Sequence, residues 1–500
     1  MKSKLSTTYH MKGNSIFSLA LFMLFLMLLS SCKKLVTIDP PVSSIRTDQV
    51  FNVDLQAQAA MAGVYTLMIN GSSLASNSAE GGFARGLTTI AGGQSADEMT
   101  FSAPTPYSTN KLTSLLSYYG ISLWSSAYKT IYSANAMLEG IAASKSPDLH
   151  DNVRTELIAE SKFIRAFSYL YLVSLFGDVP KVLTTDFNKT ALLPRAPQKE
   201  IYDLIVQDLK DAQAALPADY SNAPNGQRII PNKWAATALL ARVYLYEGDY
   251  ANAAAQATAV INNGQYSLVS DPNKVFLTNS KEAIWQLQQD VHITSLGNAT
   301  IEGAEFIPNT NRHTGLIYVF LTDQLMNSFE PGDKRRQSWV DTTNSTIYGG
   351  ARDIYYYPVK YKTGSDNYVI GGAPTEYYMV LRLAEQYLIR AEAEYRGANG
   401  GQAAAIADLN VIRTRAGLAN LPNSLSPDQL LKAVAHERQI ELFCEWGHRW
   451  LDLRRLGLAH DVLSNISYKQ PWAGDFQFMY PIPVTEITVD RFLTQNPGYN

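Results

Sequence analysis

Apolar residues recur at three- and four-residue steps through long stretches of this chain, and that spacing restricts it to a largely helical fold. One such stretch covers 157–173, and Gly177 and Pro180 follow it, as a helix-ending glycine and proline should. Two more cover 201–216 and 234–244. The sequence therefore predicts a mainly α protein.

The stretch at 234–244 is followed by a turn that indicates which kind of helical fold the chain adopts. Glu247-Gly248-Asp249-Tyr250 is followed by Ala253-Ala254, and a helix, a Gly-Asp-Tyr turn and an alanine-rich helix resemble the tetratricopeptide (TPR) repeat. Such units bury their faces only by stacking. We therefore expect TPR helix pairs at about 119–264 and 376–456. Irregular spacing between the units favours a repeat-containing scaffold over a clean solenoid.

Two regions lack helical periodicity. Residues 70–118 are rich in Gly, Ser, Thr and Asn, and 265–375 contain short strand-like runs such as 283–287 and 355–357. Loops of this length are commonly functional. We therefore expect one domain over 51–500, with a helical scaffold, long irregular loop regions that bind the ligand, and a few short strands.

The N-terminus predicts export. Three lysines and no acidic residue accompany an apolar run from Ile16 to Leu29, which is shorter than the roughly 20 residues of a spanning helix. Leu29-Ser30-Ser31-Cys32 resembles the lipobox of bacterial lipoproteins. A membrane-spanning anchor and an ordinary signal peptide with a chance cysteine are the alternatives. We expect a signal peptide at 1–31, lipid on Cys32 and a tether at 32–50.

Composition limits the partners and cofactors of the chain. The formal net charge of −3 becomes more negative once the three leader lysines are removed, so nothing attracts nucleic acid. The only cysteine besides Cys32 is Cys444, which leaves no intrachain disulfide. The run from His436 to Ile440 begins like a zincin helix but places isoleucine where the second histidine must stand. The sequence therefore predicts no metal site and no cofactor.

The densest group of charges lies near the end of the chain. Glu437, Glu441 and Glu445 fall on one helix face, among four arginines that end at Arg455. A carboxylate acid/base site is one interpretation, and a structural ion-pair network is the other, because charges at this spacing interact on any helix. Nearly equal numbers of Arg and Glu favour the network.

Blocks along nearly the whole chain, taken in order, resemble the SusD/RagB family of outer-membrane lipoproteins from Bacteroidetes. Each block is weak alone, and their shared order makes the resemblance specific. Trp446 is a departure, because it lengthens the spacing between the preceding glutamate and Gly447. The blocks are Cys32 with 35–41, 50–65, Trp124 to Asn135, 159–166 with Phe176-Gly177-Asp178-Val179-Pro180, 195–216, 238–246, 437–442 with Gly447-His448-Arg449-Trp450 and 452–455, and Tyr480-Pro481-Ile482-Pro483 with 486–487 and 495–499.

The resemblance implies a role as well as a fold. By this resemblance the protein is not an enzyme. Members of the family resemble lids that sit over a SusC-like, TonB-dependent outer-membrane transporter and capture glycans or other nutrients at the cell surface. By this resemblance the TPR helices are the scaffold, the irregular regions bind the ligand, and lipid on Cys32 holds the chain on the outer membrane, facing the cell exterior.

Aromatic rings suit the C–H faces of sugars, and polar side chains beside them bind hydroxyl groups. The candidates in the irregular regions are the aromatic residues Tyr107, Trp339, Tyr348 and Phe101 and the polar residues Asp97, Asn311 and Arg312. Packing within the protein is the alternative for each ring. A surface-anchored glycan hydrolase and a ligand-free TPR adaptor stay open as functions, and the sequence does not identify the glycan or other nutrient.

Overall fold

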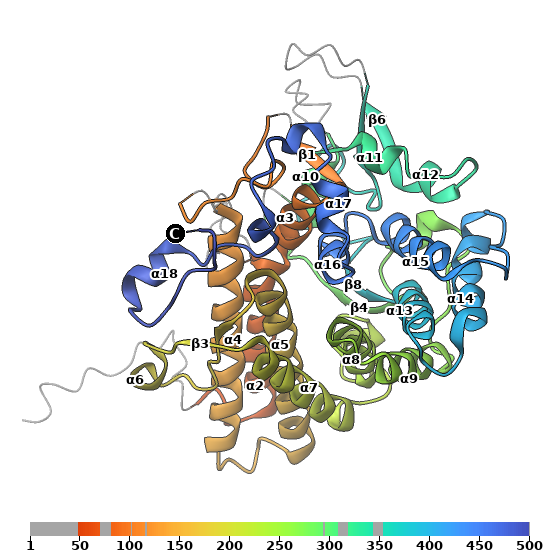
Figure 1. Cartoon of the computed structure of the whole chain (residues 1–500). Helices are drawn as coiled ribbons and strands as arrows, with labels where there is room; N and C mark the ends of the chain where they lie inside the picture. The colour runs from red at the N-terminus through yellow and green to blue at the C-terminus, as the bar shows by residue number, and fades with distance from the viewer. Residues whose placement is uncertain are drawn as a thin grey trace, which may run out of the picture. The chain divides into compact units, whose positions relative to one another are not determined.

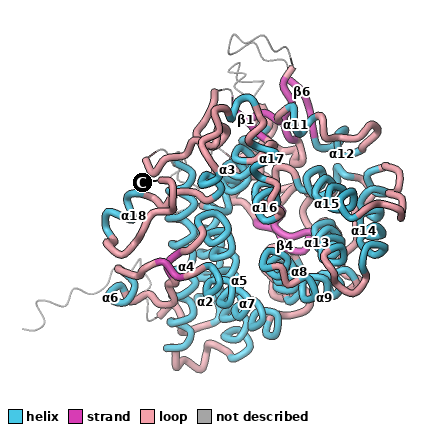
Figure 2. Tube along the Cα trace, viewed as in Figure 1, coloured by secondary structure: helices cyan, strands magenta, loops and turns pink. Residues whose placement is uncertain are grey.

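Two compact units divide the chain, Met1–Val50 and Phe51–Asn500, and nearly all described residues lie in the second. The computed structural model describes residues 49–70, 82–101, 103–115, 118–293, 296–308, 319–343 and 354–499. The second unit is mainly helical, with short strands between its helices (Figures 1 and 2). Within the described ranges no helix has both the length and the apolar character to cross a membrane.

The helices of the first half pack in succession. α4 (Tyr118–Ala143) lies against α5 (Asp151–Phe176), α5 against α7 (Gln198–Ala215), α7 against α8 (Lys233–Glu247), and α8 against α9 (Tyr250–Ile261). Figure 1 shows α5, α7, α8 and α9 following one another across the unit. This order of neighbours is what stacked helix pairs produce.

The second half continues the same array. α9 packs against α13 (Leu383–Tyr395), which in turn contacts α14 (Gly401–Ala416) and α15 (Pro427–Leu442). Alanine and leucine side chains fill the contact, among them Ala391, Ala405 and Leu409. The predicted fold class, a helical scaffold containing TPR-like pairs with irregular regions and short strands, is confirmed.

Local signals set the ends of these helices as the sequence predicts. Gly177 closes α5 with φ of +78°, and its amide donates to the carbonyl of Val173 at 3.0 Å. Gly248 closes α8 in the left-handed region, where glycine is favoured. Asp249 then begins α9 by accepting from the amide of Asn252. The Gly-Asp pair thus stops one helix and starts the next.

Short strands form four antiparallel pairs within the described ranges. β4 pairs with β8, which leads directly into α13 and so attaches the irregular central region to the scaffold. The strands are β1 (Met99–Phe101) with β5 (Val319–Leu321), β2 (Val179–Pro180) with β3 (Arg195–Ala196), β4 (Ala283–Leu287) with β8 (Tyr378–Arg382), and β6 (Val340–Thr343) with β7 (Tyr355–Pro358). The strand-like runs at 283–287 and 355–357 are therefore strands.

The region expected to be a loop at 70–118 contains a buried helix, α3 (Thr88–Ser95), which packs on α16 (His448–Arg455). The approach is close, because a Cβ added to Gly92 would lie 2.7 Å from the Cα of Gly447. The amide of Trp446 also donates to Thr89 Oγ1 at 2.8 Å. Glycine and threonine, which suggested a loop, here permit tight packing.

Aromatic rings around α5 form much of the core. The Trp285 ring contacts Phe163 and Phe167 with centroids 5.0 and 5.2 Å apart, and Trp446 also contacts Phe167.

The remaining elements are α2 (Asp54–Asn70), η2 (Phe83–Leu87), α6 (Phe187–Thr190), η3 (Pro224–Gly226), η4 (Pro272–Lys274), α10 (Ile301–Phe306), α11 (Asp323–Met326), α12 (Lys334–Trp339), α17 (Ala459–Leu463), η5 (Ser467–Lys469), η6 (Asp475–Phe478) and α18 (Val484–Val489).

Candidate functional site

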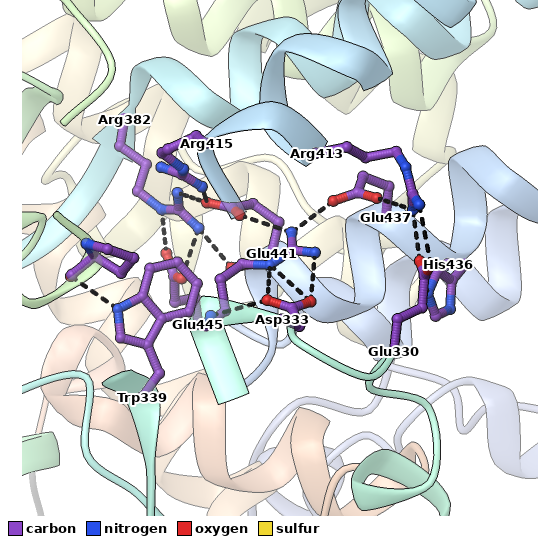
Figure 3. A network of polar contacts seen from close by, with 12 residues as sticks. Glu330, Asp333, Trp339, Arg382, Arg413, Arg415, His436, Glu437, Glu441 and Glu445 are labelled. Carbon is purple, nitrogen blue, oxygen red and sulfur yellow. Dashed lines mark hydrogen bonds and ion pairs between the residues drawn. The ribbon is translucent and has the colours of Figure 1, made fainter. Parts of the chain in front are cut away.

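The acidic face of α15 lies inside a buried ion-pair network (Figure 3). Glu441 is fully buried at its centre, and one carboxylate oxygen accepts from Arg335 at 3.0 Å. The other oxygen accepts from Arg382 at 2.5 Å and contacts Arg415. Burial alone would raise the pKa of Glu441, but the three guanidinium groups outweigh burial and hold it well below its ordinary value.

The surrounding charges complete the neutralisation. Glu445 accepts from Arg382 at 2.8 Å and from the Lys360 ammonium at 2.5 Å, and Glu437 accepts from Arg335 at 2.6 Å. These groups are all buried. The contacts confirm the ion-pair network, and an ionised carboxylate held by several cations is poorly suited to exchange protons with a substrate.

Two rings expected to contact a ligand pack inside the protein instead. Trp339 is fully buried, and its Nε1 donates to the carbonyl of Pro272 at 2.9 Å (Figure 3). Tyr107 is 2% exposed, and its hydroxyl accepts from the amide of Gly120 at 2.7 Å. The prediction that these two rings bind a ligand is therefore wrong, because neither presents a face to solvent.

Asp97 is also buried, and its two carboxylate oxygens each accept from Arg449 at 2.8 Å. This ion pair joins the end of α3 to α16, so the prediction of a ligand-binding role is wrong for Asp97 as well. Phe101 is half-buried in β1, and its ligand contact stays a prediction. The remaining candidates, Cys32, Tyr348, Asn311 and Arg312, lie outside the described residues.

A cleft of about 660 Å³ opens between α2, α5, the connection at 221–230 and the chain at 287–290. Its walls are largely apolar, with Met61 and Ile69 from α2, Leu157 from α5 and Ile229 from the connection. Ligand sites in proteins commonly enclose about 300–1,000 Å³ and combine such walls with a few placed polar groups. This cleft is therefore the candidate binding site.

A hydrogen-bonded pair provides the main polar group of the cleft. The hydroxyl of Tyr65 donates to Glu160 Oε2 at 2.6 Å, across from α2 to α5. Burial raises the pKa of Glu160 to about 8, so its carboxyl group is largely protonated at neutral pH. Burial also raises the pKa of Glu156, one helical turn away on the same wall. The cleft thus holds two carboxyl groups on α5 in an apolar setting, and Asp290 lines it as a third, exposed carboxyl group.

Two amide side chains beside the cleft have oxygen atoms that accept no hydrogen bond. Gln289 is 7% exposed, and its Nε2 donates to the carbonyl of Asn298 at 2.7 Å, while its Oε1 has no hydrogen-bond partner. Asn222 Oδ1 is likewise buried without a donor. Both oxygens lie beneath the surface of the cleft, so they are unsatisfied buried acceptors and not contacts offered to a ligand.

Most of the cleft falls outside the two irregular regions where a ligand was expected. Only 287–290 belong to them, whereas α2 and α5 provide the long walls. A sequence signal for Glu160 does exist. It occupies the apolar stripe of α5 between Leu157 and Ile164, where a carboxyl group needs a partner or a raised pKa. Among the described residues no cluster of His, Cys, Asp and Glu could hold a metal ion.

Comparisons with known proteins cover most of the chain. The family profile described as "SusD family" matches residues 314–499, and one described as "Starch-binding associating with outer membrane" matches residues 49–245. Over 417 residues the chain is 28% identical to SusD-like protein P2 of Formosa agariphila, which spans 75% of this chain and 80% of that protein.

Two further proteins are similar at lower identity or in structure. Starch-binding protein SusD of Bacteroides thetaiotaomicron is 25% identical over 421 residues, 68% of this chain and 72% of that protein. The crystal structure of a SusD-like protein from Bacteroides fragilis superposes with a TM-score of 0.73 at 21% identity, covering 92% of this chain and all of that chain. That structure supports the fold alone.

Proposed function

Because the chain belongs to the SusD/RagB family, we propose that it is a non-enzymatic, surface-anchored protein that captures glycans in the cleft between α2 and α5. The observation that carries the proposal is this 660 Å³ cleft, most of whose walls lie in the segment matched by the starch-binding profile. A relative that is itself named a starch-binding protein adds support.

The chemistry of the cleft fits a sugar. Apolar side chains such as Ile69 offer surfaces to C–H faces, while the half-buried carboxyl group of Glu156 and the exposed amide of Gln288 bond to hydroxyl groups. A sugar needs both apolar and polar contacts in its binding site, because its ring presents an apolar face and a polar edge.

The arrangement of acids favours binding over hydrolysis. Glycoside hydrolysis uses two carboxyl groups that flank the scissile bond from opposite sides. Glu156 and Glu160 instead lie one turn apart on a single helix, and so on one wall of the cleft, while Asp290, the third lining carboxyl group, is exposed and accepts from the amide of His292. The other dense acidic group, centred on Glu441, is neutralised by arginine. A hydrolase is therefore the weaker candidate.

Lipid on Cys32 completes the proposal by holding the protein on the outer membrane beside a SusC-like transporter, to which it delivers the captured glycan. The lipobox-like sequence supports the anchor, and family membership supports the partner. Replacing Cys32 by alanine should move the protein from the membrane fraction to the soluble fraction. Retention of Cys32→Ala in the membrane fraction would contradict anchoring at this residue.

Blocking the cleft tests the binding site. Ala62 is exposed on α2 and lines the cleft, so Ala62→Trp should fill it and weaken glycan binding at least tenfold in isothermal titration. Thr155→Trp is the matched control, because Thr155 is exposed on α5 but does not line the cleft. Equal affinity of both variants would place the site elsewhere.

The same titrations decide among the functions. Oligosaccharide cleavage by the purified protein would overturn the non-enzymatic assignment. Absence of binding to any member of a broad glycan panel, with or without the co-purified transporter, would favour the ligand-free adaptor.

A further inference from the structure

A long connection leaves strand β2 and returns to its partner β3. β2 ends at Pro180 and β3 begins at Arg195, so the connection covers 181–194 and includes the short helix α6. We call it the β2–β3 loop. Connections between antiparallel neighbours usually have about two to five residues, and longer ones are commonly functional. Figure 1 shows α6 standing out from the body of the unit, beyond α4.

Polar groups at the start of the loop bind the scaffold. Thr184 Oγ1 donates to Glu139 Oε1 of α4 at 2.5 Å, and the amide of Thr185 donates to the same oxygen at 3.1 Å. The amide of Val182 donates to the hydroxyl of Tyr169, on α5, at 2.6 Å. These contacts fix the start of the loop on α4 and α5.

The apolar side chains of the loop are exposed instead. Phe187 in α6 is 75% exposed, and Leu183 and Leu192 are 44% and 45% exposed. The side chain of Lys189, two residues after Phe187, is 73% exposed. Single exposed apolar residues need no explanation, but an aromatic ring, two leucines and a lysine presented by one fixed loop have the composition of a segment that rests in a membrane interface.

The loop also lies beside the point at which the chain arrives from Cys32. Phe51 packs directly on Gly140 of α4, where an added Cβ would overlap its ring. The residue before Gly140 is Glu139, which holds the loop. Residues 33–50 span at most about 65 Å when fully extended, so lipid on Cys32 would keep this end of α4 within that distance of the membrane.

From this arrangement we propose that the β2–β3 loop is a second membrane contact, in which Phe187 and its neighbouring leucines enter the interface of the lipid surface that holds Cys32. The inference rests on the proposed anchor and adds an orientation to it. A tether alone leaves the protein free to turn, whereas a tether and a loop determine which side faces the membrane. The loop is too small to replace the anchor, because even one myristoyl chain binds membranes only marginally. Release of Cys32→Ala from the membrane fraction is therefore still expected.

A fluorescent label beside Phe187 reports the contact. Asn188 is exposed, Cys444 is buried and Cys32 carries the lipid, so Asn188→Cys provides the accessible thiol. The lipidated full chain is reconstituted with vesicles of phosphatidylethanolamine and phosphatidylglycerol. Bimane at position 188 should be quenched by doxyl-labelled lipids. Bimane on Ala403→Cys, exposed on α14 at the opposite side of the unit from α6 (Figure 1), should not be quenched.

Substitutions of the ring test its role. In the labelled chain Phe187→Ser should abolish quenching without changing thermal stability, because the ring is exposed, and Phe187→Trp should preserve quenching. In co-sedimentation of Cys32→Ala with the same vesicles, adding Phe187→Ser should weaken binding about tenfold. Leu115→Ser is the matched control, since Leu115 is 76% exposed but precedes the other end of α4, and it should leave binding unchanged.

The outcomes distinguish the loop from the anchor. An unmodified Cys32 in mass spectrometry of the membrane-bound protein would refute the anchor and this inference with it. A lipidated Cys32 without quenching at position 188, or with equal quenching at 188 and 403, would refute the loop contact alone. Loss of transporter co-purification or of self-association in Phe187→Ser, with quenching unchanged, would also overturn it and assign the loop to a protein partner.

Discussion

Replacing Glu441 by alanine removes the carboxylate that three buried guanidinium groups share. The side chains of Arg335, Arg382 and Arg415 are 0%, 2% and 4% exposed, so water cannot replace the lost partner. Removing one member of a buried pair costs about 3–5 kcal/mol. Glu437 and Glu445 still neutralise part of the cluster, so the expected loss is about 3 kcal/mol.

Urea unfolding at pH 7 measures this loss, and urea is preferred to guanidinium chloride because salt screens ion pairs. Asp203→Ala is the control, since it breaks the Lys199–Asp203 pair, whose side chains are 78% and 60% exposed, and it should change stability far less than Glu441→Ala does.

The effect of Glu441 also has a defined pH dependence. Its folded-state pKa is depressed, so its contribution is present above its ordinary pKa and is lost as pH falls through the folded-state value. The difference between Glu441→Ala and the wild type should therefore be equal at pH 5 and pH 7. A loss as small as that of Asp203→Ala would refute the reasoning, because it would mean that the network contributes no more than a surface pair.

Two other predictions use the same unfolding assay. Trp339→Ala should destabilise the protein by about 3–5 kcal/mol, because the ring is fully buried, while leaving glycan affinity unchanged; weaker binding at unchanged stability would restore Trp339 as a ligand contact. Burial raises the pKa of Glu302 to about 8, so its contribution to stability is complete below its ordinary pKa and is lost as pH rises through about 8. Unfolding free energy should therefore fall between pH 5 and pH 8, and Glu302→Gln should reduce that fall; an identical pH profile for the variant would contradict it.

The scaffold could be predicted because its signals are local. Gly248 and Asp249 end one helix and begin the next through their own backbone and side-chain geometry, whatever the rest of the chain does. Apolar periodicity likewise depends on residues one or two turns apart. The four-residue spacing of Glu437 and Glu441 likewise predicted their shared face on α15, whereas Glu445 lies three residues beyond the end of that helix, and the prediction of one helix face was wrong for it.

The ligand site could not be predicted in this way, because distant segments decide which side chains face solvent. Trp339 follows a polar run in the sequence, yet its ring is covered by Phe276 and Phe443. Asp97 pairs with Arg449, 352 positions further along the chain. Nothing local distinguishes such a buried residue from one in an exposed loop.

The contact between α3 and α16 also bears on the order in which this protein can mature. The hydrogen bond from Trp446 to Thr89 joins residues 357 positions apart, and closing so long a segment is slow and entropically costly. Because synthesis begins at the N-terminus, α3 is made long before the residues of α16 that cover it. A chain that stops short of Gly447 would leave the face of α3 that packs on α16 uncovered, so complete burial of α3 requires the closing residues.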